Sequence, residues 1–199
     1  MNLTKFFNLQ RQLDEHILDE HPELKGQDNL DWKILALQVE LGECANEWRG
    51  FKKWSNDQKP ITALEEHLRC EYCRGKGEIY VGCICDKCEG KGEILNRIKN
   101  PLLEEYVDCL HFILSIGLEL GYANVTPAQI MKEENITDAF LSVIETVVSI
   151  DISRHYHDYE ILISRFIELG EMLDFTWEQI EQAYISKNEI NHKRQNQGY

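Results

Sequence analysis

The sequence is most informative at first for what it lacks. It has no run of about 18 apolar residues, so no membrane-spanning helix is expected. Residues 1–7 become charged at once, which argues against a secretion signal, and we expect a cytoplasmic protein. Only four of 199 residues are proline and 10% are aromatic, which argues against a disordered chain. Basic residues are also few.

The charge balance excludes further classes of protein. Twenty-one Lys and Arg residues face 35 Asp and Glu residues, for a formal net charge of −14. Binding to a nucleic-acid polymer or an anionic membrane needs an excess of basic side chains, so neither partner is expected. The acidity has two explanations that composition does not separate: a charged surface that keeps molecules apart, or carboxylates that hold cations.

Seven cysteines, an odd number, are unevenly distributed, since five lie between Cys70 and Cys88. In a chain without a leader this clustering favours a metal site over disulfides. Residues 70–79 and 85–94 form an internal repeat, each with a Cys-x-x-Cys pair followed by Gly-x-Gly-Glu-Ile. Four thiolates complete a closed tetrahedral site for structural zinc, and the glycines let backbone amides donate to the sulfurs. The predicted ligands are Cys70, Cys73, Cys85 and Cys88.

This cysteine repeat resembles the zinc-binding repeats of DnaJ-type chaperones, with two repeats here, enough for one ion. Cys83 in place of Cys85, or His67, are alternative ligands, and redox activity is a weaker alternative role. The segment, residues 66–99, is interpreted as an inserted module that braces the fold or binds another protein. Cys44 and Cys109 are expected in the core because they lie on apolar helix faces.

Helical periodicity dominates the rest of the chain, and alternating strand patterns are nearly absent. Helices are expected near residues 3–17, 31–49, 101–121, 136–154, 157–173 and 176–193. Thr126–Gln129 and Thr176–Gln179 both resemble capping boxes that open helices. The predicted fold class is therefore all-α: one helical bundle formed by residues 1–199, with a small zinc-binding insertion.

Two helices carry carboxylates in register. Glu40, Glu43 and Glu47 share one stripe of the second helix, and Glu105 with Asp108 repeats the pattern on the third. If the stripes meet, their oxygens suit Mg²⁺ or Mn²⁺, which takes further ligands from water and phosphates. The alternative is two solvated acidic faces.

The last predicted helix supplies cations. Lys187, Asn191 and Arg194 share one face, and such a cluster is a plausible phosphate clamp in so acidic a chain. The alternative is a frayed, solvated tail.

Residues 40–55 and 104–112 resemble the dimeric, all-α dUTPases of Gram-positive bacteria and their phages, within the MazG-like all-α nucleoside triphosphate pyrophosphohydrolase superfamily. The signature is Glu-x-x-Glu on one helix and Glu-x-x-Asp on the next. Residues 9–14 and 187–195 also resemble the end motifs of this family. The resemblance departs at the cysteine module, and removal of the module restores a family-like spacing.

The resemblance implies hydrolysis of dUTP to dUMP and pyrophosphate by a homodimer. It also implies Mg²⁺ ligands at Glu40, Glu43, Glu105 and Asp108. Glu43 is the expected general base, with Glu47 as the competing candidate, and Lys187, Asn191 and Arg194 would contact the phosphates. Gln12 (or Gln10), Asn46 and Trp54 are candidates for the nucleoside pocket. The alternatives are a pyrophosphohydrolase for another nucleotide and a non-enzymatic adaptor that recruits a partner through the zinc module.

Overall fold

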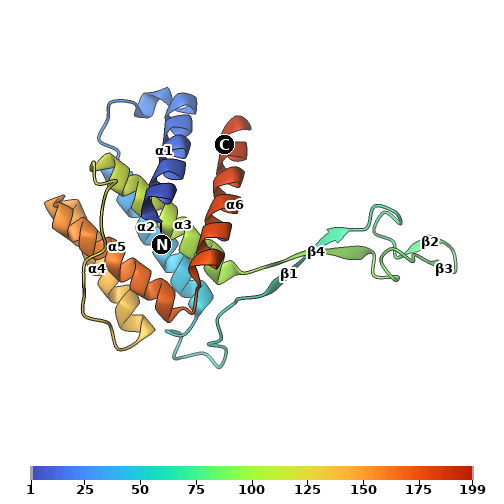
Figure 1. The fold of residues 1–199 in the computed structure, drawn as a ribbon. Coiled ribbons are helices and arrows are strands. Elements are labelled where there is room, and N and C mark those ends of the chain that lie inside the picture. Colours follow the sequence, from blue (N-terminus) through green and yellow to red (C-terminus); the bar gives the residue numbers. More distant parts are fainter. Residues whose placement is uncertain (1, 199) are drawn as a thin grey trace. The chain divides into compact units, whose positions relative to one another are not determined.

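The computed structural model describes residues 2–198, and most of them are helical (Figure 1). The α-helices are α1 (Leu3–Glu20), α2 (Leu30–Trp48), α3 (Pro101–Glu119), α4 (Ile136–Ser153), α5 (Tyr156–Met172) and α6 (Trp177–Asn196), and a 3₁₀ turn, η1 (Pro22–Leu24), follows α1. The predicted all-α class is confirmed. The helices form one compact unit, and Ile61–Pro101 form a second. Among the described residues, no helix is long and apolar enough to cross a bilayer.

The start of α6 confirms one of the two predicted capping boxes. Thr176 Oγ1 accepts from the backbone N–H of Gln179 at 3.3 Å, and Gln179 Oε1 accepts from the N–H of Thr176 at 2.9 Å. These reciprocal bonds satisfy two backbone donors that a helix start otherwise leaves unpaired.

The capping box predicted at Thr126–Gln129 is wrong, because this segment is irregular and α4 begins only at Ile136. The backbone N–H of Ala128 donates instead to Ser164 Oγ on α5, at 2.8 Å. Asn135 caps α4 by accepting from the N–H of Asp138 at 3.0 Å. The tertiary contact with α5 replaces the local motif.

Helices α3 and α5 are joined by two reciprocal contacts. Tyr106 on α3 donates to the carbonyl of Phe166 on α5 at 3.0 Å, and Tyr159 on α5 donates to the carbonyl of Ile113 on α3 at 2.9 Å. Each hydroxyl lies over a glycine one turn further along. A Cβ at Gly170 would be 2.4 Å from the Tyr106 hydroxyl, and one at Gly117 would be 2.0 Å from that of Tyr159.

The inserted unit contains four short strands that the sequence did not predict: β1 (Leu64–Arg69), β2 (Glu78–Tyr80), β3 (Cys83–Ile84) and β4 (Glu93–Lys99). β1 pairs antiparallel with β4, from Leu64 opposite Lys99 to Arg69 opposite Glu93, and β2 pairs with β3. Nearly every strand residue is exposed. Without a buried face there is no alternation of apolar and polar residues for sequence analysis to detect.

Gly117→Ala tests the α3–α5 contact. The added methyl group overlaps the Tyr159 hydroxyl, so we expect the free energy of unfolding to fall by about 1–3 kcal/mol in urea titrations. The matched control is Gly42→Ala on α2, where a Cβ meets nothing within 4 Å; there we expect a gain of about 0.5–1 kcal/mol from helix propensity. Equal effects of the two substitutions would contradict the packing described here.

Candidate active site and metal centres

Three of the predicted magnesium ligands meet at one point. Glu40 and Glu43 from α2 and Glu105 from α3 each place a carboxylate oxygen within 4.8 Å of the others. Burial, then the carboxylates of Asp108 and Glu43, raise the pKa of Glu40 to about 7. Burial and the surrounding carboxylates likewise raise the pKa of Glu105 to about 7. Such a cluster of like charges is stabilised by a cation, and its hard oxygen donors fit Mg²⁺.

The fourth predicted ligand, Asp108, lies beside this cluster and forms an ion pair with Lys187 of α6. Burial raises the pKa of Asp108, while the Lys187 ammonium opposes the rise. Asp108 in turn raises the pKa of both Glu40 and Glu105, so its charge acts on the cluster. The ion pair therefore brings a predicted phosphate-binding cation to the edge of the carboxylate cluster.

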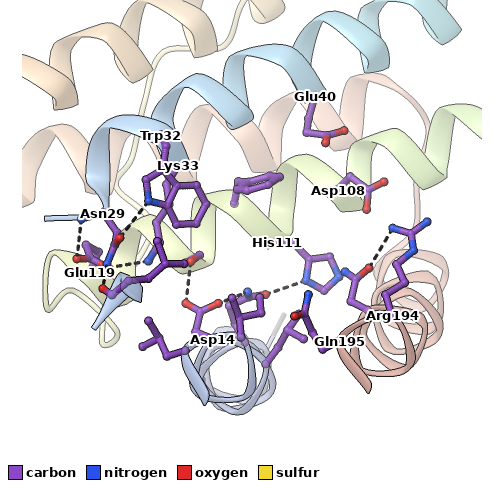
Figure 2. A pocket seen from close by; sticks show the side chains of 18 of the residues that line it. Asp14, Asn29, Trp32, Lys33, Glu40, Asp108, His111, Glu119, Arg194 and Gln195 are labelled. Atoms are coloured by element: carbon purple, nitrogen blue, oxygen red, sulfur yellow. Dashed lines mark hydrogen bonds and ion pairs between the residues drawn. The ribbon is translucent and has the colours of Figure 1, made fainter. Parts of the chain in front are cut away.

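A cavity of about 320 Å³ adjoins the cluster and is lined by residues of α1, α2, α3 and α6. Glu40, Asp108, Lys187, Asn191 and Arg194 all line it, so ligand candidates for metal and phosphate share one pocket. Figure 2 shows Glu40, Asp108 and Arg194 toward one end and Asn29, Trp32 and Glu119 toward the other. The apolar lining is Leu13, Ile17, Leu18, Leu24, Trp32 and Phe112. This mixture of apolar walls and a few polar groups is typical of a small-molecule site.

A hydrogen-bond network joins Tyr184 to four residues that line the cavity: Gln10, Asp14, His111 and Ser115. Gln10 Oε1 lies 2.8 Å from His111 Nδ1 and accepts from the Tyr184 hydroxyl at 2.6 Å, while Gln10 Nε2 donates to Asp14 at 2.7 Å. The other Asp14 oxygen accepts from Ser115 at 2.7 Å. Burial lowers the pKa of His111 to about 3, so the imidazole is neutral.

At the far end, Lys33 pairs with Glu119 at 2.6 Å, and the Trp32 indole donates to Asn29 at 3.1 Å. Sequence analysis assigned no role to His111, Asp14, Trp32 or Lys33. His111 follows Asp108 by three residues and so shares its helix face, a signal that was available.

Four other predicted site residues lie outside the residues that line the cavity. Gln12 and Asn46 are exposed, and Trp54 is 77% exposed. Glu47 is half-buried on α2 and lies outside the group of three gathered carboxylates. Gln10, the alternative to Gln12, is buried and lines the cavity. The roles of Gln12, Asn46, Trp54 and Glu47 stay predictions.

Comparison with known proteins decides the family. A family model described as dUTPase matches residues 2–74 and 95–199. The chain belongs to the all-α dUTPase family. The expected enzyme class, dUTP diphosphatase, is thereby confirmed. No curated protein and no solved structure shows significant similarity to the chain.

The match omits residues 75–94, the part of this dUTPase that holds Cys83, Cys85 and Cys88. The family match therefore ends after Cys73, and the grouping of the four cysteines is argued from the structure. Cys44 and Cys109, in contrast, are fully buried in the helical core, where sequence analysis expected them.

In the module the four predicted zinc ligands, Cys70, Cys73, Cys85 and Cys88, are buried together. Sγ of Cys70 lies 3.9 Å from that of Cys85, and Sγ of Cys73 lies 3.6 Å from that of Cys88. These separations exceed a disulfide bond of about 2.05 Å. They match the roughly 3.8 Å edge of a tetrahedron whose metal–sulfur bonds are about 2.3 Å. The cluster therefore fits zinc.

Backbone hydrogen bonds support the sulfurs and join the two halves of the cysteine repeat. Within each half, the N–H groups of Gly77 and Gly92 donate to the sulfurs of Cys73 and Cys88, both at 3.3 Å. Between the halves, the N–H of Cys70 donates to the carbonyl of Gly92 at 2.9 Å, and that of Cys85 to the carbonyl of Gly77 at 2.8 Å. A Cβ on Gly77 would lie 2.3 Å from the carbonyl oxygen of Gly90. The φ of Gly77 is also positive, at 75°, so only glycine suits this position. Cys83 is partly exposed and lies outside the group of four.

Metal analysis of the purified protein tests the cysteine cluster. We expect about one zinc per chain, because four thiolates complete one closed site. The double variant Cys70→Ser/Cys73→Ser should lose it, and the matched variant Cys83→Ser should keep it. Zinc retained by the double variant would show that the ligand set is wrong.

Proposed function

We propose that this dUTPase is a Mg²⁺-dependent pyrophosphohydrolase (with Mn²⁺ as a substitute) that converts dUTP and water to dUMP and pyrophosphate. The observation that carries the proposal is the convergence of three carboxylates within 4.8 Å. Glu40 belongs to that cluster and also lines the cavity with Lys187, Asn191 and Arg194. One pocket therefore combines candidate metal ligands, candidate phosphate-binding groups and space for a nucleoside.

In this reaction Glu40, Glu43, Glu105 and Asp108 would hold the magnesium. When bound, Mg²⁺ neutralises triphosphate charge and acidifies water, which prepares an in-line attack on phosphorus. Glu43 accepts the proton of the attacking water, with Glu47 as the alternative base. Glu43 suits the role because it is exposed, unlike the half-buried Glu40 and Glu105, and so can be reached by water.

The phosphates are held from α6. Lys187 forms an ion pair with Asp108, so its ammonium already lies beside the metal ligands. With Asp108 holding the metal, Lys187 would contact the triphosphate, where negative charge builds as the bond breaks. Arg194 and Asn191 add donors from the same helix face.

We further infer that the enzyme is a homodimer. Leu35 and Val39 on α2 are exposed, as are Leu141, Val148 and Ile152 on α4. Asn46 lies on the same face of α2 as Leu35 and Val39, at helical spacing. A partner subunit on this face would cover Asn46, a predicted nucleoside-site residue that is exposed in the single chain. A single-chain mass in analytical ultracentrifugation at micromolar concentration would exclude the dimer.

A role for the module as a protein-binding site has its own support. Residues 61–101 carry seven acidic and seven basic side chains, whereas the whole chain has a net charge of −14. A groove in the module is lined by Leu68, Tyr72, Ile94 and Leu95, with Arg74 and Lys87 beside them. We infer a partner segment that offers apolar and acidic side chains. Unchanged recovery of partners by a chain lacking residues 75–94 would rule this out.

A nucleotide panel tests the proposed activity. With Mg²⁺, the purified protein should release pyrophosphate from dUTP at least about 100-fold faster than from dCTP, whose base leaves buried polar groups of the pocket unpaired. It should also act faster on dUTP than on dTTP or UTP, because the pocket must exclude their additional methyl or hydroxyl group. Removal of divalent metal with a chelator should stop the reaction. Equal rates on all four nucleotides would instead favour a general pyrophosphohydrolase, and no hydrolysis at all would favour the adaptor.

Glu43→Gln tests the mechanism. Loss of a metal ligand and general base should lower kcat for dUTP by about 10²–10⁴-fold, with unchanged far-UV helicity. The matched control is Glu15→Gln, an exposed glutamate on α1, which should retain activity. A Glu43→Gln enzyme that turned over normally would remove Glu43 from the mechanism.

A further inference from the structure

We propose that the network of Asp14, Gln10 and Tyr184 holds His111 in a single tautomer, with its proton on Nδ1. The bare Nε2 then faces the nucleoside as a hydrogen-bond acceptor. His111 thereby selects nucleotides that present a hydrogen-bond donor at that point. The inference rests on the proposed function for its ligand, although the tautomer itself can be measured without substrate.

The orientation of the Gln10 amide is the first step. Gln10 lies 2.7 Å from Asp14 Oδ1, whose other oxygen accepts from Ser115. A carboxylate only accepts hydrogen bonds, so the Gln10 NH₂ group must face Asp14. Burial raises the pKa of Asp14, while the hydrogen bonds from Ser115 and Gln10 and the charge of Lys33 oppose the rise and favour the carboxylate. With the NH₂ group fixed, Gln10 Oε1 must point the other way, toward Tyr184 and His111.

The tautomer of His111 follows from that orientation. Gln10 Oε1 is an acceptor and lies 2.8 Å from His111 Nδ1 and 2.6 Å from the Tyr184 hydroxyl. Both of these atoms must therefore donate to it. A neutral imidazole carries one proton, so a proton on Nδ1 leaves Nε2 bare. The Tyr184 ring stacks on the imidazole at 4.1 Å between centroids and holds it in its plane.

The bare nitrogen has no protein partner. Among the described residues, His111 Nε2 and Gln195 Oε1 are both buried without a hydrogen bond, and both residues line the cavity. Figure 2 places His111 between Asp14 and Asp108, with Gln195 nearby. Buried polar atoms are almost always paired, so a buried acceptor in a ligand pocket indicates a ligand that donates.

A deoxyuridine nucleotide offers two suitable donors: the imide N3–H of the base and the 3′-hydroxyl of the sugar. Cytosine has a lone pair at N3 instead, so an acceptor opposite that atom would reject dCTP by leaving two acceptors face to face. Thymine keeps its N3–H, and His111 therefore does not discriminate against dTTP. The shared chemistry is a donor, and the substrates below identify which one.

The first experiment reads the tautomer by NMR of the full chain labelled with ¹⁵N-histidine, without nucleotide. The His111 signals, identified by their loss in His111→Asn, should show a protonated Nδ1 and an unprotonated Nε2. Asp14→Asn should shift the proton toward Nε2, since an amide at residue 14 lets Gln10 turn over. The control Ser115→Ala, which keeps the carboxylate, should not. A proton on Nε2 in the unmodified protein overturns the proposal.

The second experiment compares the unmodified enzyme with His111→Asn on dUTP, dCTP, N3-methyl-dUTP and 2′,3′-dideoxy-UTP. Asparagine retains a donor for Gln10 but has no atom at the Nε2 position. We expect kcat/KM for dUTP to fall about 10-fold or more. The substitution should have little effect on the analogue that already lacks the donor: N3-methyl-dUTP and dCTP if the base donates, dideoxy-UTP if the sugar does.

An equal loss on all four nucleotides would mean a structural role only, and no loss on any would mean no contact; either result overturns the proposal. If His111→Asn fails to fold, the tautomer spectrum and the analogue series measured on the unmodified enzyme still test the proposal. A protein with the expected tautomer that does not hydrolyse dUTP would refute the proposed function but not the tautomer.

Discussion

The contact on which the site depends most is the reciprocal one between α3 and α5. Two tyrosine hydroxyls each reach a carbonyl of the opposite helix, and each passes over a glycine that leaves room for it. Because the two bonds meet α3 at Tyr106 and Ile113, about two turns apart, they fix its rotation as well as its position. The other face of α3 carries Glu105, Asp108, His111 and Ser115. A rotation of α3 would carry all four away from α1, α2 and α6 together.

The buried polar groups of the site lower the stability of the folded protein. Burial and mutual repulsion raise the pKa of Glu40 and Glu105 to about 7, which means that their ionised forms are held at a cost in the absence of a cation. The cavity adds two buried polar atoms, His111 Nε2 and Gln195 Oε1, that have no hydrogen-bond partner among residues 2–198. Proteins violate the rules of burial mainly at functional sites, where a ligand satisfies what the fold does not. The surrounding core, which is nearly all apolar, supplies the stability that permits this.

Local sequence patterns predicted the helices and the cysteine cluster. The features that they did not predict depend on contacts between residues far apart in the sequence. The periodicity of apolar residues predicted the helices. The internal repeat, with its conformationally required glycines, predicted the group of four cysteines. The ion pair of Lys187 with Asp108 joins residues 79 positions apart, and no spacing rule specifies it. Gln10 and Gln12 were equivalent by composition, but only the helix packing determines that Gln10 is buried. Thr126 begins a capping-box sequence, but no helix starts there, because the following backbone bonds to α5.

The pairing of Leu64 with Lys99 determines where the chain enters and leaves the cysteine module. The chain enters and leaves the module through neighbouring residues of one antiparallel ribbon, so the two ends lie about 5 Å apart whatever lies between them. The helices of a bundle connected in this way can pack in the same manner whatever the length and sequence of the segment beyond the ribbon. The link between α2 and α3 is thus a position at which the chain can carry an additional unit, here the cysteine module, and at which a designer can exchange that unit for another domain.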